Sequence, residues 1–321
     1  MKTTKKQKKI IIKDIINRLI ILVIFSFIFF VCFKFWQSYR QSIWNGKNQL
    51  NFIVQTDEIL IFSYHPEDQA LNILTIPATV HFPVAKDFGD YAVAKIYSLG
   101  ESQKIGGERL LSLTLQDFFA IPIDGYIIRN QKSEIRNQNE ILSRGNILPL
   151  YACLVKKECR TNFTVWDLIK LSFKLRELRP GTVKTTSFTK TGLLKEEVLA
   201  DGSLILTPDY LKIDQLALSL FSDKVTYDEN LSIGVLNGTN QEGLAKTTSR
   251  LVKNLGVDLI YTGDTDKPYN QSIIYYQDKK VKASYTLKRL AEIFQIKKIE
   301  LNDKIEGDIV LVLGEDLNSL H

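Results

Sequence analysis

The sequence predicts an α/β protein that follows one membrane-spanning helix. Three observations lead to this fold class: an uncharged apolar run near the N-terminus, alternating strand and helix patterns over residues 51–228, and a βαββαβ order over residues 229–321. Alternating strands and helices are typical of a sheet covered by helices. We therefore expect an α/β domain with a mixed sheet, followed by a small α+β sandwich with both helices on one face.

The apolar run is long enough to cross a bilayer. Residues 19–33 (LIILVIFSFIFFVCF) carry no charge, and apolar side chains resume after Lys34 up to Trp36. At about 1.5 Å per helical residue, residues 19–36 reach roughly 27 Å, close to the ~30 Å hydrocarbon core. A buried core helix is the alternative, but seven basic residues precede the run and only Asp14 opposes them. We expect an anchor in the lipid bilayer at residues 19–36.

The residues around the run predict its orientation. Seven basic residues lie before it and three lie in the comparable window after it, so the positive-inside rule places residues 1–18 in the cytoplasm as a basic tail. A cleaved signal peptide would need small residues at the end of the run, where FKFWQSYRQ stands instead. We expect a retained signal-anchor, a tether at residues 37–50 and an extracytoplasmic bulk. Trp44 belongs either to the membrane interface or to the start of the packed region.

The charge distribution argues against a nucleic-acid partner. The whole chain has 42 Lys and Arg against 36 Asp and Glu, and the first 18 residues hold seven and one of these. The rest of the chain therefore carries 35 of each and is neutral. A nucleic-acid-binding surface needs basic charge concentrated on the folded region. We expect a single-pass protein of the cell membrane that binds no nucleic acid.

Cysteine and histidine usage predicts no metal site and no cofactor. Cys153 and Cys159 are the one pair of cysteines outside the anchor, and the five residues between them permit a disulfide loop in an oxidising compartment. The spacing leaves the reduced and oxidised forms open. His65, His81 and His321 are scattered, with no second ligand at zinc-site spacing.

The patterns in residues 51–228 follow the order of an α/β domain. Two apolar runs on either side of a turn cluster predict a hairpin, and a later helix has Asn162 or Thr164 as its cap. The expected strands are 59–63, 71–76, 123–128, 183–188 and 204–206; the expected helices are 107–119, 162–178 and a short one after Pro208, with a long connection at 129–160.

The patterns in residues 229–321 predict the βαββαβ order. Thr239 and Glu242 have the spacing of a capping box, and Gly256 is placed to end the helix that follows. The expected strands are 231–236, 257–262, 272–276 and 309–313, and the second helix carries an apolar face over 287–294.

Three segments in order resemble the extracytoplasmic domain of LytR-CpsA-Psr (LCP) proteins. They are DEILIFSYHPEDQALNILTIPATV, AVAKIYSLGE and FFAIPIDGYIIRN, and the resemblance covers about residues 51–220. It implies a bacterial cell-envelope protein whose partner is peptidoglycan or a lipid-linked glycan. LCP proteins transfer such glycopolymers to the cell wall, holding a polyprenyl pyrophosphate with clustered Arg, Asp and Mg²⁺.

The departures from the LCP pattern predict a degenerate domain. The Arg-Asp pair that should follow Ile76-Pro77 is replaced by Ala78-Thr79, and the expected GSDSR loop before Asp57 is missing. Asp57 and Lys95 alone occupy motif positions, so they are the weak catalytic candidates, although each equally fits a turn residue or an exposed lysine. Charge neutralisation makes up most of phosphoryl-transfer catalysis, so the loss of these cations favours loss of the reaction.

The last segment resembles a second module of the same proteins, the LytR C-terminal domain. The matched motifs are the opening around Val235, Asn237-Gly238 and Gly243, and the ending Leu313-Gly314 with Asp316. This resemblance covers about residues 231–317 and implies a cell-envelope role without an established reaction.

Three functions follow as hypotheses. The first is a non-catalytic binding or scaffolding relative of the LCP transferases, anchored in the membrane. The second is an active LCP-type phosphotransferase that attaches polyprenyl-pyrophosphate-linked glycopolymer to the cell wall and requires Mg²⁺. The third is a membrane-bound regulatory protein.

Overall fold

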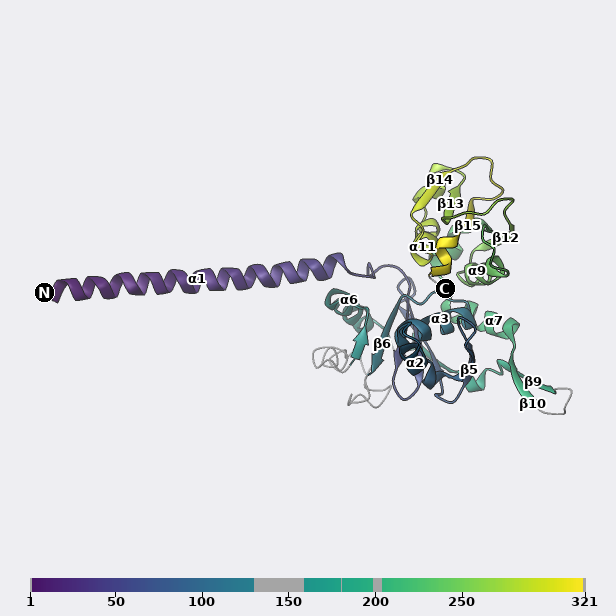
Figure 1. Ribbon diagram of the computed structural model, residues 1–321, viewed down its shortest axis with the longest axis horizontal. Helices are drawn as coiled ribbons and strands as arrows, with labels where there is room; N and C mark the ends of the chain where they lie inside the picture. Colours follow the sequence, from purple (N-terminus) through teal and green to yellow (C-terminus); the bar gives the residue numbers. More distant parts are fainter. Residues whose placement is uncertain (1, 130–158, 180, 199–203, 320–321) are drawn as a thin grey trace.

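The structure of the protein, a computed structural model, describes residues 2–129, 159–179, 181–198 and 204–319. The long helix α1 (Lys2–Arg40) projects away from a body made of two α/β domains (Figure 1). Within it, Ile16–Arg40 is long and apolar enough to cross a membrane, and none of that segment is buried against the body. The expected apolar anchor helix is therefore present as a candidate span.

The first domain is organised around a mixed six-stranded sheet in the order β7-β6-β1-β2-β3-β8. Strand β1 pairs in parallel with β6, and β3 pairs in parallel with β8, while the other pairs are antiparallel. This is the mixed sheet that the sequence predicts. Its strands are β1 (Leu50–Gln55), β2 (Ile59–His65), β3 (Ala70–Ile76), β6 (Gly125–Arg129), β7 (Cys159–Thr161) and β8 (Val183–Ser187).

Side chains that alternate along the central strands fill two separate cores, one on each face of the sheet. Ile53, Ile61 and Leu74 pack beneath α2 (Val93–Ser102), α3 (Gly107–Phe119) and α7 (Tyr210–Phe221). Phe52 and Phe62 point to the opposite face and pack beneath α6 (Val165–Arg176). The sheet is therefore covered by helices on both faces.

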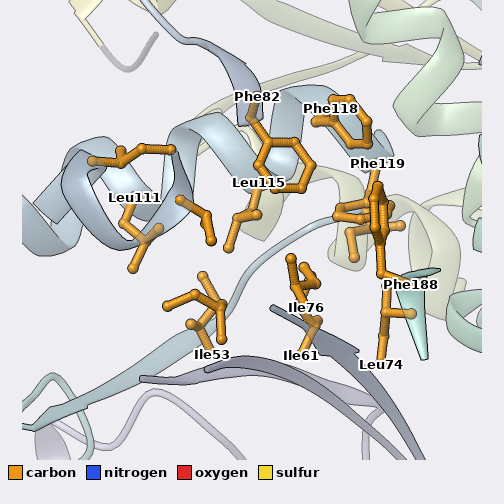
Figure 2. Packing of buried hydrophobic residues seen from close by; sticks show 14 of the residues in the cluster. Ile53, Ile61, Leu74, Ile76, Phe82, Leu111, Leu115, Phe118, Phe119 and Phe188 are labelled. Atoms are coloured by element: carbon orange, nitrogen blue, oxygen red, sulfur yellow. The ribbon is translucent and has the colours of Figure 1, made fainter. Parts of the chain in front are cut away.

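Four phenylalanine rings close the core on the α3 face (Figure 2). The ring of Phe82 lies with its centroid 4.4 Å from Phe118, 6.1 Å from Phe119 and 5.6 Å from Phe188. Phe82 comes from the short hairpin of β4 (His81–Val84) and β5 (Gly89–Ala92), and Phe188 lies in the 3-10 turn η2 (Phe188–Lys190). Elements that are distant in sequence thus meet in one aromatic cluster.

Smaller elements complete the first domain. A two-stranded ribbon, β9 (Leu194–Val198) and β10 (Leu204–Pro208), precedes α7. The short helix α8 (Lys224–Glu229) leads from α7 into the second domain and begins at Asp223, whose carboxylate accepts hydrogen bonds from the backbone of Val225 and Thr226.

The second domain is a five-stranded mixed sheet in the order β12-β11-β15-β13-β14, with an apolar core of its own. The expected strands and helices are present, and the sheet has an additional edge strand, β14. Its elements are β11 (Ser232–Asn237), α9 (Leu244–Asn254), β12 (Asp258–Asp264), β13 (Ile273–Tyr276), α10 (Lys279–Ala283), α11 (Tyr285–Ile293), β14 (Lys298–Leu301), β15 (Ile309–Leu313) and η3 (Glu315–Ser319).

One predicted detail is wrong, one strand was not expected, and one open alternative is decided. The helix after β11 has no Thr239 capping box, because α9 begins at Leu244 behind Gly243, which takes a left-handed conformation with φ 79°. Strand β1 is not among the expected strands, because the polar residues Gln49 and Asn51 are buried rather than solvated. Trp44 is only 4% exposed and belongs to the packed region.

The two domains meet at the C-terminal end of α3. Arg250 of α9 donates to the carbonyl oxygens of Asp117 (3.1 Å) and Phe118 (2.7 Å), and Asn254 donates to that of Phe119 (3.2 Å). The last carbonyls of a helix lack intrahelical donors and carry the negative end of its dipole, so a guanidinium satisfies them well. Arg250 also pairs with Asp214 of α7 at 2.7 Å. One side chain therefore joins α3, α7 and α9.

A buried ion pair forms a second link between the domains. Arg289 of α11 lies 2.8 Å from Asp124, and the two side chains are only 7% and 14% exposed. Asp124 also accepts a hydrogen bond from the backbone of Asn51 at 2.8 Å, which ties the pair to the start of β1. Because removal of one partner would leave a buried charge unpaired, this link depends on both residues.

The aromatic cluster supports a first prediction. Replacing Phe82 with Ala should lower the free energy of unfolding by about 3–5 kcal/mol, because a fully buried ring leaves a cavity beneath α3. Urea denaturation of the detergent-solubilised full chain measures the change. Phe173→Ala is the control, since that ring is 61% exposed and its loss should change stability by less than about 0.5 kcal/mol. Equal effects of the two substitutions would contradict the packing.

Asp117 supports a prediction about pH. Burial raises the pKa of its carboxyl to about 6, against the opposing influence of Arg250 and Lys86. The folded chain thus holds this proton more tightly than the unfolded chain, and stability falls as pH rises from about 4 to about 6. Asp117→Asn should remove this loss and stabilise the protein at pH 7.5 by an amount on the order of 2 kcal/mol.

Melting temperatures at pH 4.5 and pH 7.5 measure that effect. Asp90→Asn, the same chemical change at an exposed position, provides the control. A stability difference between the two pH values that is as large in Asp117→Asn as in the unchanged protein would contradict the assignment.

Candidate functional site

Asp57 lies in the turn between β1 and β2, where the strand register brings it close to the end of β6. Its carboxylate is 2.8 Å from Nη2 of Arg129, and the two side chains are 68% and 18% exposed. Exposed ion pairs contribute at most about 1 kcal/mol because water screens them. The candidate carboxylate is therefore held by a local cation at the surface of the domain.

Lys95 lies in the first turn of α2 and is exposed. The segment before it connects β3 to β4 through Ala78 and Thr79, and the carbonyl of Ala78 accepts a hydrogen bond from the backbone of Ala94. The motif positions next to Lys95 thus hold an aliphatic and a hydroxyl side chain, neither of which can neutralise a pyrophosphate.

The two candidates make no direct contact with each other among the described residues. No hydrogen bond or ion pair joins Asp57 to Lys95 in the part of the chain that is described. Over the same residues, no group of three His, Cys, Asp or Glu side chains is placed to hold a metal ion. The motif positions therefore hold an exposed ion pair, Asp57 with Arg129, and a solvated lysine, Lys95.

Cys159 lies in the edge strand β7 and is disulfide-bonded. Cys32 is a free, exposed cysteine of α1. Cys153 lies outside the described residues, so its pairing with Cys159 stays a prediction.

A polar cleft of about 570 Å³ lies beside α3 and includes Glu108, Arg109 and Tyr126 in its lining. Arg160 of β7 is 3.4 Å from Glu101 and 3.9 Å from Glu108. The hydrogen bond from the backbone N–H of Gly107 lowers the pKa of Glu101, and Arg160 lowers it further. These contacts bind α2, α3 and β7 to one another.

A second cleft, of about 590 Å³, is lined by His65, Asn72 and Lys224 among others. Burial lowers the pKa of His65, whose Nε2 lies 2.9 Å from the carbonyl oxygen of Leu220. Asn72 donates to the same oxygen at 2.8 Å. His65 and Asn72 thus satisfy the carbonyl of Leu220 near the end of α7, so a structural role accounts for the histidine.

A third cleft, of about 430 Å³, lies where α1 ends. We call it the juxtamembrane cleft and define it by the following residues: Tyr39, Arg40, Ser42, Ile43, Trp44, Asn45, Asn48, Gln49, Leu50, Asp124, Trp166, Lys170, Arg289 and Glu292. They come from the anchor helix, from the segment before β1, from α6 and from α11. The cleft therefore touches both domains and the candidate membrane span.

A buried carboxylate behind this cleft holds several of its lining residues in place. Asp167 forms a capping box with Thr164 at the start of α6 and also accepts hydrogen bonds from the backbone of Ile43 (3.2 Å) and Trp44 (3.3 Å). Burial opposes its ionisation, but hydrogen bonds from Ser42 and Thr164 hold the pKa of Asp167 below its usual value. No pattern in the sequence points to this cleft, because Asp167 has only the position of a residue in the first turn of a helix.

The C-terminal segment matches a known family. Residues 230–317 match the family described as LytR cell envelope-related transcriptional attenuator (LytR_C). No curated protein matches the chain in sequence.

The chain is also distantly similar to solved structures of LCP proteins. Bacillus subtilis TagT has 14% identity, with 55% of this chain and 91% of that chain covered and a TM-score of 0.38. The LytR-CPS2A-psr family protein YwtF (TagT) with bound octaprenyl pyrophosphate lipid has 14% identity, with 55% and 90% covered and a TM-score of 0.37. Lin1025 from Listeria innocua has 12% identity, with 53% and 95% covered and a TM-score of 0.37.

The LytR_C match is the more specific finding, and it agrees with the expected C-terminal module. Residues 230–317 of this chain thus match the LytR_C family, whose description names the cell envelope.

Proposed function

We propose that this protein is a membrane-anchored, extracytoplasmic protein of the cell envelope that binds or scaffolds envelope components without catalysing transfer. The anchor is α1, with its N-terminus in the cytoplasm. The two domains face peptidoglycan or a lipid-linked glycan carrier.

The observation that carries the proposal is the chemistry at the motif positions. A pyrophosphate has several negative charges, and phosphoryl transfer depends on cations that surround them. At these positions the chain has Ala78 and Thr79, an exposed Lys95, and an Asp57 that is already paired with Arg129. No metal-binding group of acidic side chains accompanies them among the described residues.

The packing beneath α3 supports the same conclusion. The space between the sheet and α3 is filled by buried aliphatic side chains and by the rings of Phe82, Phe118 and Phe119 (Figure 2). A polyprenyl chain would need an apolar channel. The filled core beneath α3 would have to open to provide one.

The joint between the domains supports a scaffolding role. Arg250 and Asn254 hold the end of α3, and Arg289 holds Asp124 next to β1. These contacts fix the LytR_C domain against the first domain, so that the two present a single composite surface. A stable surface is what a binding or scaffolding protein requires.

A turnover assay tests the proposal. The detergent-solubilised full chain should release no polyprenyl phosphate from octaprenyl pyrophosphate, with or without Mg²⁺, because the charge-neutralising groups are absent from the motif positions. TagT, a structure of which has this lipid bound, is assayed in parallel.

Asp57→Ala and Lys95→Ala are the diagnostic variants. Mg²⁺-dependent turnover that is lost in both variants would establish the transferase function instead. Turnover that neither variant reduces would point to a site elsewhere and would equally contradict the non-catalytic proposal.

A further inference from the structure

The juxtamembrane cleft lies at the height of the lipid headgroups if α1 spans the bilayer. Trp36 is the last apolar residue of the run, and Arg40 follows four residues later, about 6 Å along the helix axis. The headgroup layer on each side of the hydrocarbon core is roughly 5–8 Å thick. Tyr39 and Arg40, which line the cleft, therefore stand within that layer.

Aromatic contacts fix the body of the protein at this height. The ring of Trp166, at the start of α6, lies 5.1 Å from Phe35 and 6.0 Å from Tyr39 in edge-on arrangements. Ser38 accepts a hydrogen bond from the backbone of Trp166 at 3.2 Å. Figure 1 shows α6 at the side of the body nearest to α1. Trp166, which lines the cleft, is therefore held against the end of α1.

One cation of the cleft lining is left for an anionic ligand. Lys170 and Arg289 are held by Asp167 and Asp124 at 3.1 Å and 2.8 Å, and Nη1 of Arg289 also lies 4.0 Å from Glu292. Arg40 lies over the ring of Trp36, with 5.0 Å to the ring centroid, and forms no ion pair with any residue that the structure describes. Glu292 is the second carboxylate of the lining, and its side chain is 61% exposed.

A buried donor in the cleft wall lacks a partner. The side chain of Arg289 is 7% exposed, and its Nε has no hydrogen-bond acceptor in the described structure. A buried N–H without an acceptor costs about 1–3 kcal/mol, and hydrogen bonds from a guanidinium to phosphate are among the stronger ones in proteins. A phosphate oxygen would supply the missing acceptor.

Part of the rim of the cleft is apolar. The side chain of Ile43 is 41% exposed and that of Tyr39 is 59% exposed, although both stand beside a candidate membrane span. Such a rim suits the glycerol and first methylene groups that follow a lipid phosphate, because tyrosine and aliphatic side chains are stable at the bilayer interface.

We propose that the juxtamembrane cleft binds the phosphate-bearing headgroup of a lipid in the outer leaflet. Arg40 and Arg289 are its cationic residues, and Tyr39, Ile43 and Trp166 contact the apolar part. A phospholipid and a polyprenyl phosphate share this chemistry. The inference rests on the proposed anchoring, and it concerns a site separate from the motif positions of Asp57 and Lys95.

Native mass spectrometry of the detergent-solubilised full chain tests the cleft. Phosphatidylglycerol and a polyprenyl phosphate are titrated separately, and diacylglycerol, which lacks phosphate, is the reference ligand. Retention of one phosphate lipid but not the other identifies the source of the headgroup. Arg40→Gln should weaken that lipid about tenfold, because it removes one charge-assisted hydrogen bond.

Matched variants distinguish loss of the binding site from a general effect of charge or of misfolding. Lys47→Gln removes the same charge from the same segment but does not line the cleft, so it should leave binding unchanged. Glu292→Gln should strengthen binding, because it removes a negative charge from the lining. A misfolded variant would not bind more tightly.

Two results would overturn the proposal. One is equal retention of diacylglycerol and the phosphate lipids, and the other is equal binding by Arg40→Gln and Lys47→Gln. Extraction of the full chain from membranes by alkaline carbonate would contradict the anchoring itself. A chain that stays in the membrane but shows either of the first two results would contradict only the cleft.

Discussion

The end of α3 is the constraint on which the rest of the structure depends. Its last carbonyls, at Asp117, Phe118 and Phe119, are buried at a domain boundary and need donors that neither α3 nor its own domain supplies. Arg250 and Asn254 of α9 provide them. The same two phenylalanines that carry these carbonyls close the aromatic core over the sheet. The interior of one domain and the docking of the other are therefore set by one helix terminus.

The motif residues of the two domains occupy different kinds of position. The LytR_C domain has its motif residues in structural positions: the backbone N–H of Gly238 donates to the carbonyl of Leu313, and Asp316 accepts from Ser272 at 2.9 Å. These hydrogen bonds hold the sheet together, so the motif residues have a role in the fold itself. In the first domain the apolar framework lies in the core, whereas Asp57 and Lys95 lie at the surface, because packing and chemistry depend on different residues.

Local patterns predicted much of the fold. The hairpin of β2 and β3, the span of α3 and the strand–helix order of the second domain follow from apolar spacing and turn residues. Strand β1 was not predicted, because Asn51 is polar yet fully buried. Its side-chain oxygen Oδ1 accepts a hydrogen bond from Ser63 of the next strand. The Asp57–Arg129 pair and the juxtamembrane cleft also depend on partners remote in sequence. Only the parallel pairing of β1 with β6 and the packing of α6 against α1 reveal them.

The joint between α1 and α6 has a mechanical consequence. Asp167 accepts hydrogen bonds from the backbone on the α1 side of the joint while it caps α6, so the segment after Arg40 is clamped rather than free to swivel. If α1 spans a bilayer, a clamped joint would transmit a lateral pull on the two domains to that helix as a tilt, whereas a loose linker would absorb it. Asp167 would carry that force together with Trp166, which packs against Phe35 and Tyr39.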